Sequence, residues 1–150
     1  MTVVIRIAAE TSASVEDVVA GVTDFSERRA RIWPNVKEGH FEVHDLGETH
    51  AEVTEELWPT GIWERARYEW LPSGPVTQTV LDANALLPGS TWELTAVPSE
   101  GRTRVEAVFV RDFRRMPRGV FAHAVNRVAG RWLAGKDLRH AVCEIEKPAP

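Results

Sequence analysis

The 150-residue sequence contains a single cysteine, Cys143, so no disulfide can form within the chain. We expect this thiol to be packed, because Cys143 falls in an apolar helical pattern. A long apolar run is also missing. Arg6 interrupts the N-terminal stretch Val3–Ala9, so we expect neither a signal peptide nor a membrane span. The cytoplasm is therefore the expected compartment.

Motifs of covalent, phosphate and metal chemistry are also missing. There is no Gly-x-Ser-x-Gly, phosphate loop, dinucleotide fingerprint or cysteine pair. His40 and His44 on a strand would lie about 13 Å apart, too far to chelate a metal directly. We therefore expect no metal and no cofactor. An enzyme that works through cavity shape and one or two polar groups stays compatible with these absences.

The composition is that of an ordinary globular domain, with 43% hydrophobic and 27% charged residues. We expect one domain over residues 1–150. The net charge of −4 argues against non-specific binding of nucleic acid. Six tryptophans are a high number for this length, and such large side chains line either a core or a ligand cavity.

The stretch from Met116 to Lys147 has helical periodicity. Pro117 suits the first turn of a helix, and Pro148 follows its expected end. Large apolar residues recur every three or four positions, which predicts a stripe buried against the rest of the chain. This stripe consists of Phe121, Val125, Val128, Trp132, Leu138 and Val142.

The residues before this helix predict a sheet. Val3–Ala9 is a β-branched strand, Ser14 is placed to cap a following helix, and a second short helix is expected over Glu27–Ile32. From about Glu38 the apolar period falls to two. Turn sequences then separate six strands, at about 38–46, 51–57, 61–71, 76–83, 90–97 and 102–113. The pattern predicts an α+β fold, in which a curved seven-stranded antiparallel sheet wraps around the long C-terminal helix.

This order of elements resembles the START/Bet v 1-like (SRPBCC) helix-grip superfamily, particularly its polyketide cyclase/dehydrase and lipid-transport group. The resemblance covers the whole chain. Its local carriers are Ile32-Trp33-Pro34, Gly61-Ile62-Trp63-Glu64, Ser90-Thr91-Trp92-Glu93-Leu94, and Thr103–Phe113 with Met116-Pro117. The resemblance implies a cavity for a hydrophobic ligand between the helix and the sheet.

The aromatase/cyclases of this group place a Trp, a Ser and an Arg on alternate positions of one strand, pointing into the cavity. Trp63 matches the Trp, whereas the Ser and Arg positions fall on Arg67 and Glu69, which departs from the cyclase pattern. By the same matching, Trp92 and Phe109 would face the cavity. Arg111 would stand where a polar pocket residue does.

The strand over 61–71 has two mixed faces. One carries Trp63, Arg65, Arg67 and Glu69, and the other carries Glu64, Ala66, Tyr68 and Trp70. The sequence alone leaves the inward face open, and the resemblance favours the first. Arg65 or Arg67 would then pair with a carboxylate, enolate or phosphate of a ligand. The alternative is that Glu64, Arg65, Arg67 and Glu69 form cross-strand pairs on a solvated face of the sheet.

A cluster of four arginines stands where the last helix begins: Arg111, Arg114, Arg115 and Arg118. It could attract anionic ligands, bind an acidic partner through Arg114, Arg115 and Arg118, or pair with surface carboxylates. Three other polar residues have two interpretations each. Asp82 and Asn84 either orient a ligand or build a turn, and His123 is either a general base or structural.

The sequence therefore predicts a protein that binds a small hydrophobic ligand, neutral or acidic. Trp63, Trp92 and Phe109 would supply apolar walls, and Arg65 or Arg111 a polar anchor. Two alternatives remain open. One is a polyketide cyclase or aromatase-like enzyme using the same cavity, and the other is a partner-binding module that uses the arginine cluster.

Overall fold

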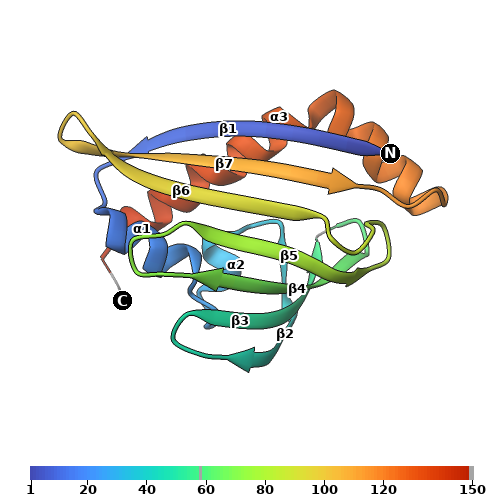
Figure 1. Ribbon diagram of the computed structural model, residues 1–150, viewed down its shortest axis with the longest axis horizontal. Helices are drawn as coiled ribbons and strands as arrows, with labels where there is room; N and C mark the ends of the chain where they lie inside the picture. Colours follow the sequence, from blue (N-terminus) through green and yellow to red (C-terminus); the bar gives the residue numbers. More distant parts are fainter. Residues whose placement is uncertain (58, 149–150) are drawn as a thin grey trace.

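A computed structural model describes residues 1–57 and 59–148. These residues form seven strands and three helices (Figure 1). The strands are β1 (Thr2–Thr11), β2 (Val36–Leu46), β3 (His50–Leu57), β4 (Ile62–Trp70), β5 (Val76–Ala83), β6 (Thr91–Ser99) and β7 (Arg102–Asp112). The helices are α1 (Val15–Val22), α2 (Arg29–Ile32) and α3 (Pro117–Glu146).

The strands form one antiparallel sheet in the order β1-β7-β6-β5-β4-β3-β2. Each strand from β2 to β7 pairs with its neighbour in sequence, and β1 joins the far side of β7. The long helix α3 lies across one face of this sheet, with α1 and α2 in contact with it (Figure 1). The predicted α+β helix-grip fold is confirmed.

The short helices between β1 and β2 follow their local sequence signals. The Ser14 hydroxyl accepts a hydrogen bond from the Asp17 backbone N–H at 3.1 Å and so caps α1, as predicted. The second helix was expected from Glu27, but it begins at Arg29. It ends at Ile32, two residues before Pro34.

The predicted apolar stripe of α3 is only partly buried. Leu138 and Val142 are buried, whereas Val128 is 88% exposed, Trp132 63% and Phe121 59%. The helix instead approaches the sheet through small residues: Gly119, Ala122, Gly130, Gly135 and Ala141. At Gly130 a Cβ atom would lie 2.6 Å from Ile5 Cδ1, so no larger side chain fits there without movement. Of the predicted stripe, Phe121 and Val125 line the cavity between α3 and the sheet, and Val128 and Trp132 lie on the exposed side of the helix.

Cys143, on the last turns of α3, is exposed, so the prediction of a packed thiol was wrong. No helix among the described residues is both long enough and apolar enough to span a lipid bilayer.

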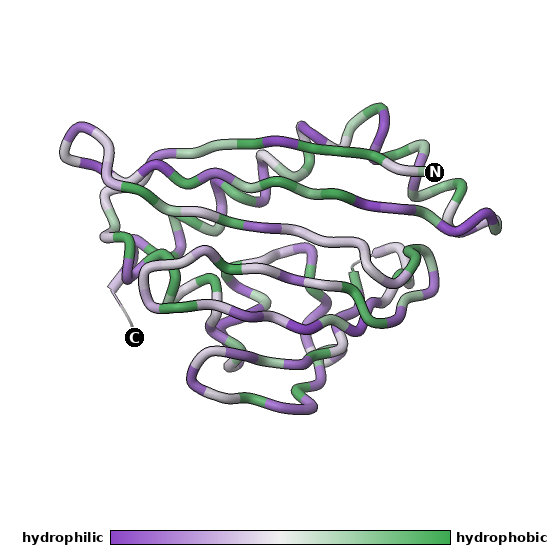
Figure 2. Tube along the Cα trace, viewed as in Figure 1, coloured by the Kyte–Doolittle hydropathy of each residue, from purple (hydrophilic) through white to green (hydrophobic). Residues whose placement is uncertain are grey.

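The hydrophobic core consists of two clusters. Hydrophobic and hydrophilic residues alternate along the strands, so one face of the sheet is apolar (Figure 2). The larger cluster packs α1 and the end of α3 on the sheet and includes Tyr68, Trp92 and Leu138. The smaller cluster surrounds Phe113 and Ala122 at the start of α3. Members of both clusters line one cavity.

Candidate ligand cavity

A cavity of about 670 Å³ lies between the sheet, α3 and the segment that joins α2 to β2. This volume falls within the range typical of small-molecule sites. Three aromatic side chains form a row in its wall. The ring centroids of Trp33 and Trp92 are 6.1 Å apart, and those of Trp92 and Phe109 are 6.0 Å apart. The row gives the cavity an apolar wall of rings tilted by 55° to one another.

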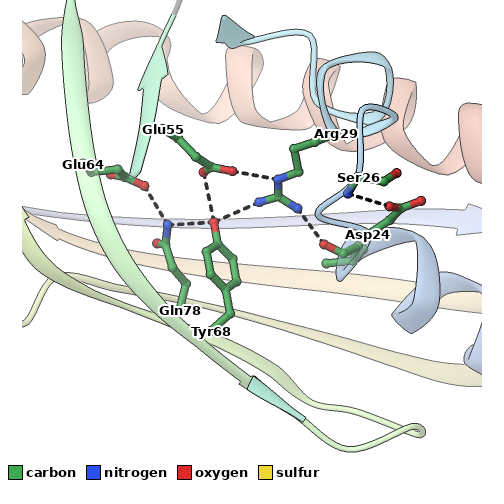
Figure 3. Close-up of polar contacts among 8 residues, drawn as sticks. Asp24, Ser26, Arg29, Glu55, Glu64, Tyr68 and Gln78 are labelled. Atoms are coloured by element: carbon green, nitrogen blue, oxygen red, sulfur yellow. Dashed lines mark hydrogen bonds and ion pairs between the residues drawn. The ribbon is translucent and has the colours of Figure 1, made fainter. Parts of the chain in front are cut away.

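A buried polar network forms another part of the wall (Figure 3). It uses the core-facing side of three adjacent strands. Glu55 on β3 stands directly opposite Glu64 on β4, and Tyr68 on β4 stands directly opposite Gln78 on β5. Two like charges opposite each other are destabilising. Each glutamate is accordingly approached by an arginine.

Arg29 compensates Glu55 and has several partners. Its Nε donates to Glu55 Oε1 at 2.7 Å, its Nη1 to the Val22 carbonyl at 2.7 Å and its Nη2 to the Tyr68 hydroxyl at 2.9 Å. Burial acts to lower the pKa of the guanidinium, but the charge of Glu55 and these hydrogen bonds outweigh it and raise the pKa above its usual value. Arg29 is thus held as a buried, fully paired cation.

The hydrogen-bond directions in the network are fixed by the charges at its two ends. The Tyr68 hydroxyl accepts from Arg29 and from Gln78 Nε2 (3.0 Å) and donates to Glu55 Oε2 at 3.1 Å. Gln78 Nε2 also donates to Glu64 Oε1 at 2.6 Å, so its amide oxygen must point the other way. Burial, then the negative charge of Glu55, raises the pKa of Tyr68 above its usual value of 10.

Arg111 compensates Glu64 far less completely. Its side chain is 12% exposed, yet its only polar contact with the described residues is an ion pair, with Nη1 3.5 Å from Glu64 Oε2. That distance is too long for a good hydrogen bond, and Nη1 is buried without a hydrogen-bond partner. The guanidinium carbon also lies 5.5 Å from the Phe109 ring centroid. Arg111 therefore ends the aromatic row with unused N–H donors.

Three more polar atoms among the described residues are buried without a hydrogen-bond partner: Trp33 Nε1, Asn35 Oδ1 and Gln78 Oε1. Like Arg111, the residues that carry them line the cavity. Leaving a buried donor or acceptor unpaired is unfavourable by about 1–3 kcal/mol. A concentration of such atoms around one cavity is typical of a site that receives a polar ligand or ordered water.

Asp137 brings a further acidic group to the cavity wall from α3. Burial raises the pKa of its carboxyl, although the positive charges of Lys136 and His140 act in the opposite direction. Within the part of the chain that the structure describes, no three His, Cys, Asp or Glu side chains are grouped so that they could hold a metal ion.

Three of the six predicted ligand-binding residues line the cavity, namely Trp92, Phe109 and Arg111. The other three, Trp63, Arg65 and Arg67, are on the opposite face of β4, so the predicted inward face was wrong. On that face Arg65 Nε lies 3.0 Å from Glu52 Oε1, and Arg67 Nε lies 2.9 Å from Glu69 Oε1. The Arg65–Glu52 pair is a solvated cross-strand pair, as in the alternative interpretation. The Arg67–Glu69 pair instead lies within β4, and Glu64, which that interpretation placed on the same solvated face, is buried. The cavity instead receives Ile62, Glu64 and Tyr68 from β4.

The structure divides the arginine cluster. Arg111 is in the cavity, whereas Arg114 Nε donates to the carbonyls of Ala83 and Leu86, both at 3.0 Å. Only Arg115 and Arg118 are exposed. Asn84 joins two turns through Trp63 N and the Gly61 carbonyl, and His123 packs edge-on against Phe113. Asp82, Asn84 and His123 do not line the cavity.

The sequence reasoning missed Arg29, Glu55, Glu64, Tyr68 and Gln78. A signal for three of them was present, because each polar residue occupies the apolar parity of its strand. Glu55 alternates in step with Ala51 and Val53, Glu64 with Ile62 and Ala66, and Gln78 with Val76 and Val80. Polar residues in step with the core on three successive strands indicate one buried polar cluster.

No sequence model of a protein family and no curated protein matches the chain. Solved structures do. The Zhui aromatase/cyclase from Streptomyces sp. R1128 is similar at a TM-score of 0.79 and 15% identity, covering 97% of this chain and 94% of that one. A protein from Thermus thermophilus is similar at a TM-score of 0.78 and 12% identity, covering 95% of this chain and 97% of that one.

A START superfamily protein from Mycobacterium smegmatis is similar at a TM-score of 0.64 and 15% identity, covering 95% of this chain and 92% of that one. Sequence identities this low establish the fold alone. The chain shares the helix-grip fold of these structures, as its order of elements predicted.

Proposed function

We propose that this helix-grip protein binds a small hydrophobic ligand in the cavity between the sheet and α3. Trp92 and Phe109 form the apolar wall, and Arg111 holds a polar group of the ligand. The observation that carries the proposal is the Arg111 guanidinium, almost buried beside the aromatic row and without a hydrogen bond to any described residue. A structural arginine in such a place would be bonded as Arg29 is.

Calorimetric binding of 2-naphthol, a neutral aromatic probe, tests this proposal. Phe109→Ala should weaken binding at least fivefold, because it removes one ring of the wall. Trp63→Ala is the matched control, since Trp63 borders a different pocket of about 330 Å³ on the other face of β4. Weaker binding in Trp63→Ala with no change in Phe109→Ala would place the ligand site outside the cavity.

A polyketide cyclase-like activity in the same cavity is the second candidate. The likeness to the Zhui aromatase/cyclase favours it, together with the free N–H groups of Arg111, which would stabilise an enolate. Incubation with a linear poly-β-ketone separates the two functions. Recovery of the poly-β-ketone unchanged supports binding alone, and recovery of a cyclised product supports catalysis.

An acidic protein partner is a third candidate, through Arg115 and Arg118. Both side chains are exposed. The apolar side chains of Phe121 and Val128 on α3 are exposed as well. Charge reversal of both arginines should abolish salt-sensitive binding of poly-glutamate and leave 2-naphthol binding intact. Unchanged poly-glutamate binding would eliminate this candidate.

The cytoplasmic location stays a prediction.

A further inference from the structure

Glu64 and Arg111 meet inside the cavity as an open pair. They come from β4 and β7, and their side chains are only 6% and 12% exposed. Glu64 Oε1 accepts from Gln78, whereas Oε2 has only the ion pair with Arg111 Nη1 at 3.5 Å. A carboxylate acceptor and a guanidinium donor thus stand close together, each with unused hydrogen-bonding capacity toward the described residues.

The charges of this polar wall balance without a ligand. Arg29 neutralises Glu55, and Arg111 neutralises Glu64. From α3 the cavity wall receives Asp137 and also Lys136, whose positive charge acts on Asp137 and whose ammonium lies 5.5 Å from the Trp132 ring centroid. An anionic ligand at Arg111 would therefore add a negative charge beside Glu64, in a region where water screens poorly. A neutral ligand avoids this repulsion.

The geometry of the pair favours one neutral group over others. A hydroxyl can donate its hydrogen to Glu64 Oε2 and accept a hydrogen bond from Arg111 at the same time. A carbonyl can only accept, and a methyl group can do neither. An alcohol, phenol or enol on an apolar body would use both halves of the pair while its body packs on Phe109.

We infer that Glu64 is a selectivity residue, which makes the cavity prefer a neutral hydroxyl-bearing apolar molecule over the corresponding carboxylate. This inference rests on the proposed binding function. It concerns which polar group the site accepts, and the proposed function concerns only whether the cavity binds an apolar molecule. The two can therefore fail separately.

Three probes with the same ring system provide the test: 2-naphthol, 2-naphthoate and 2-methylnaphthalene, measured by calorimetry at pH 7. The unmodified protein should bind 2-naphthol at least tenfold more tightly than 2-naphthoate, and more tightly than 2-methylnaphthalene. Glu64→Gln removes the negative charge and keeps the size, so 2-naphthoate should gain at least tenfold. Glu52→Gln is the matched control, because Glu52 pairs with Arg65 on the opposite face. It should change none of the three affinities.

Tighter binding of 2-naphthoate than of 2-naphthol by the unmodified protein would overturn the inference, and so would an unchanged affinity for 2-naphthoate in Glu64→Gln. Equal affinity for all three probes would overturn it and leave the proposed function standing. If none of the probes binds, the proposed function itself fails. Should Glu64→Gln not fold, Arg111→Gln gives a second measurement. There the advantage of 2-naphthol over 2-methylnaphthalene should disappear, and its persistence would contradict the inference.

Discussion

Raising the pH above 10 should destabilise the protein through one residue, Tyr68. Its hydroxyl is fully buried and donates to the Glu55 carboxylate. Burial and the charge of Glu55 both disfavour the tyrosinate, which raises the pKa of Tyr68 in the folded state. The folded protein therefore keeps this proton at a pH where the unfolded chain, with an ordinary tyrosine pKa of 10, releases it.

The sign and size of the effect follow from this difference. Because the folded-state pKa is raised, the contribution of Tyr68 to stability is fully present below pH 10 and is lost as the pH rises further. The free energy of unfolding should fall by about 1.4 kcal/mol per pH unit above 10, or about 2.7 kcal/mol by pH 12. That is a large part of the stability of a typical domain.

The chain is suited to this measurement because Tyr68 is its only tyrosine. Tyrosinate absorbance at 295 nm should rise together with the loss of native tryptophan fluorescence, not before it. Urea unfolding at pH 9 to 12 gives the change of the free energy of unfolding with pH. Tyr68→Phe lacks the ionisable proton, so its free energy of unfolding should fall less steeply above pH 10, by about 1.4 kcal/mol per pH unit. A reversible rise in absorbance with a midpoint near pH 10, in a protein whose fluorescence stays native, would refute the reasoning.

Two further substitutions test the buried Arg29–Glu55 ion pair and the start of α3. Glu55→Gln should lower the free energy of unfolding in urea by about 3–5 kcal/mol because it leaves Arg29 as an uncompensated buried charge. The double variant with Arg29→Met should recover most of that loss, and no recovery would mean that the charge is not the cause. Gly119→Ala should lower the free energy of unfolding by about 1–3 kcal/mol, because the added Cβ atom would clash with the Arg114 carbonyl oxygen. A neutral result would show that the start of α3 can move freely.

The sheet was predictable because strand periodicity and turn sequences are local signals. The inward face of β4 was not, because both of its faces mix aromatic and charged residues. What decides between them comes from elsewhere in the chain. Glu64 can be buried only because Gln78 and Arg111, on two other strands, approach it. Arg65 stays outside, where Glu52 of the neighbouring strand pairs with it.

The long helix was also predictable, but its buried side was not. A hydrophobic period marks a helix face without saying how close the neighbouring element lies. Here β1 comes so near that a Cβ atom at Gly130 would meet the Ile5 side chain, and the large residues Val128 and Trp132 are left outside. The spacing of the small residues Gly119, Ala122 and Gly130 was the better indicator of the packed side.

The two arginine–glutamate pairs of the cavity wall differ in a way that separates stability from binding. The Arg29 guanidinium donates several hydrogen bonds, so the fold depends on it. Arg111 Nη1 lies 3.5 Å from Glu64 Oε2, and the Arg111 side chain has no hydrogen bond to the rest of the described chain. Replacing a buried ion pair by apolar residues of similar size is often neutral or stabilising, by up to about 4 kcal/mol. The double variant Glu64→Leu with Arg111→Met should therefore unfold at an equal or higher urea concentration. It should also bind 2-methylnaphthalene at least as tightly as 2-naphthol. A large loss of stability would mean that the open pair supports the fold, and that its geometry reflects packing instead of a ligand.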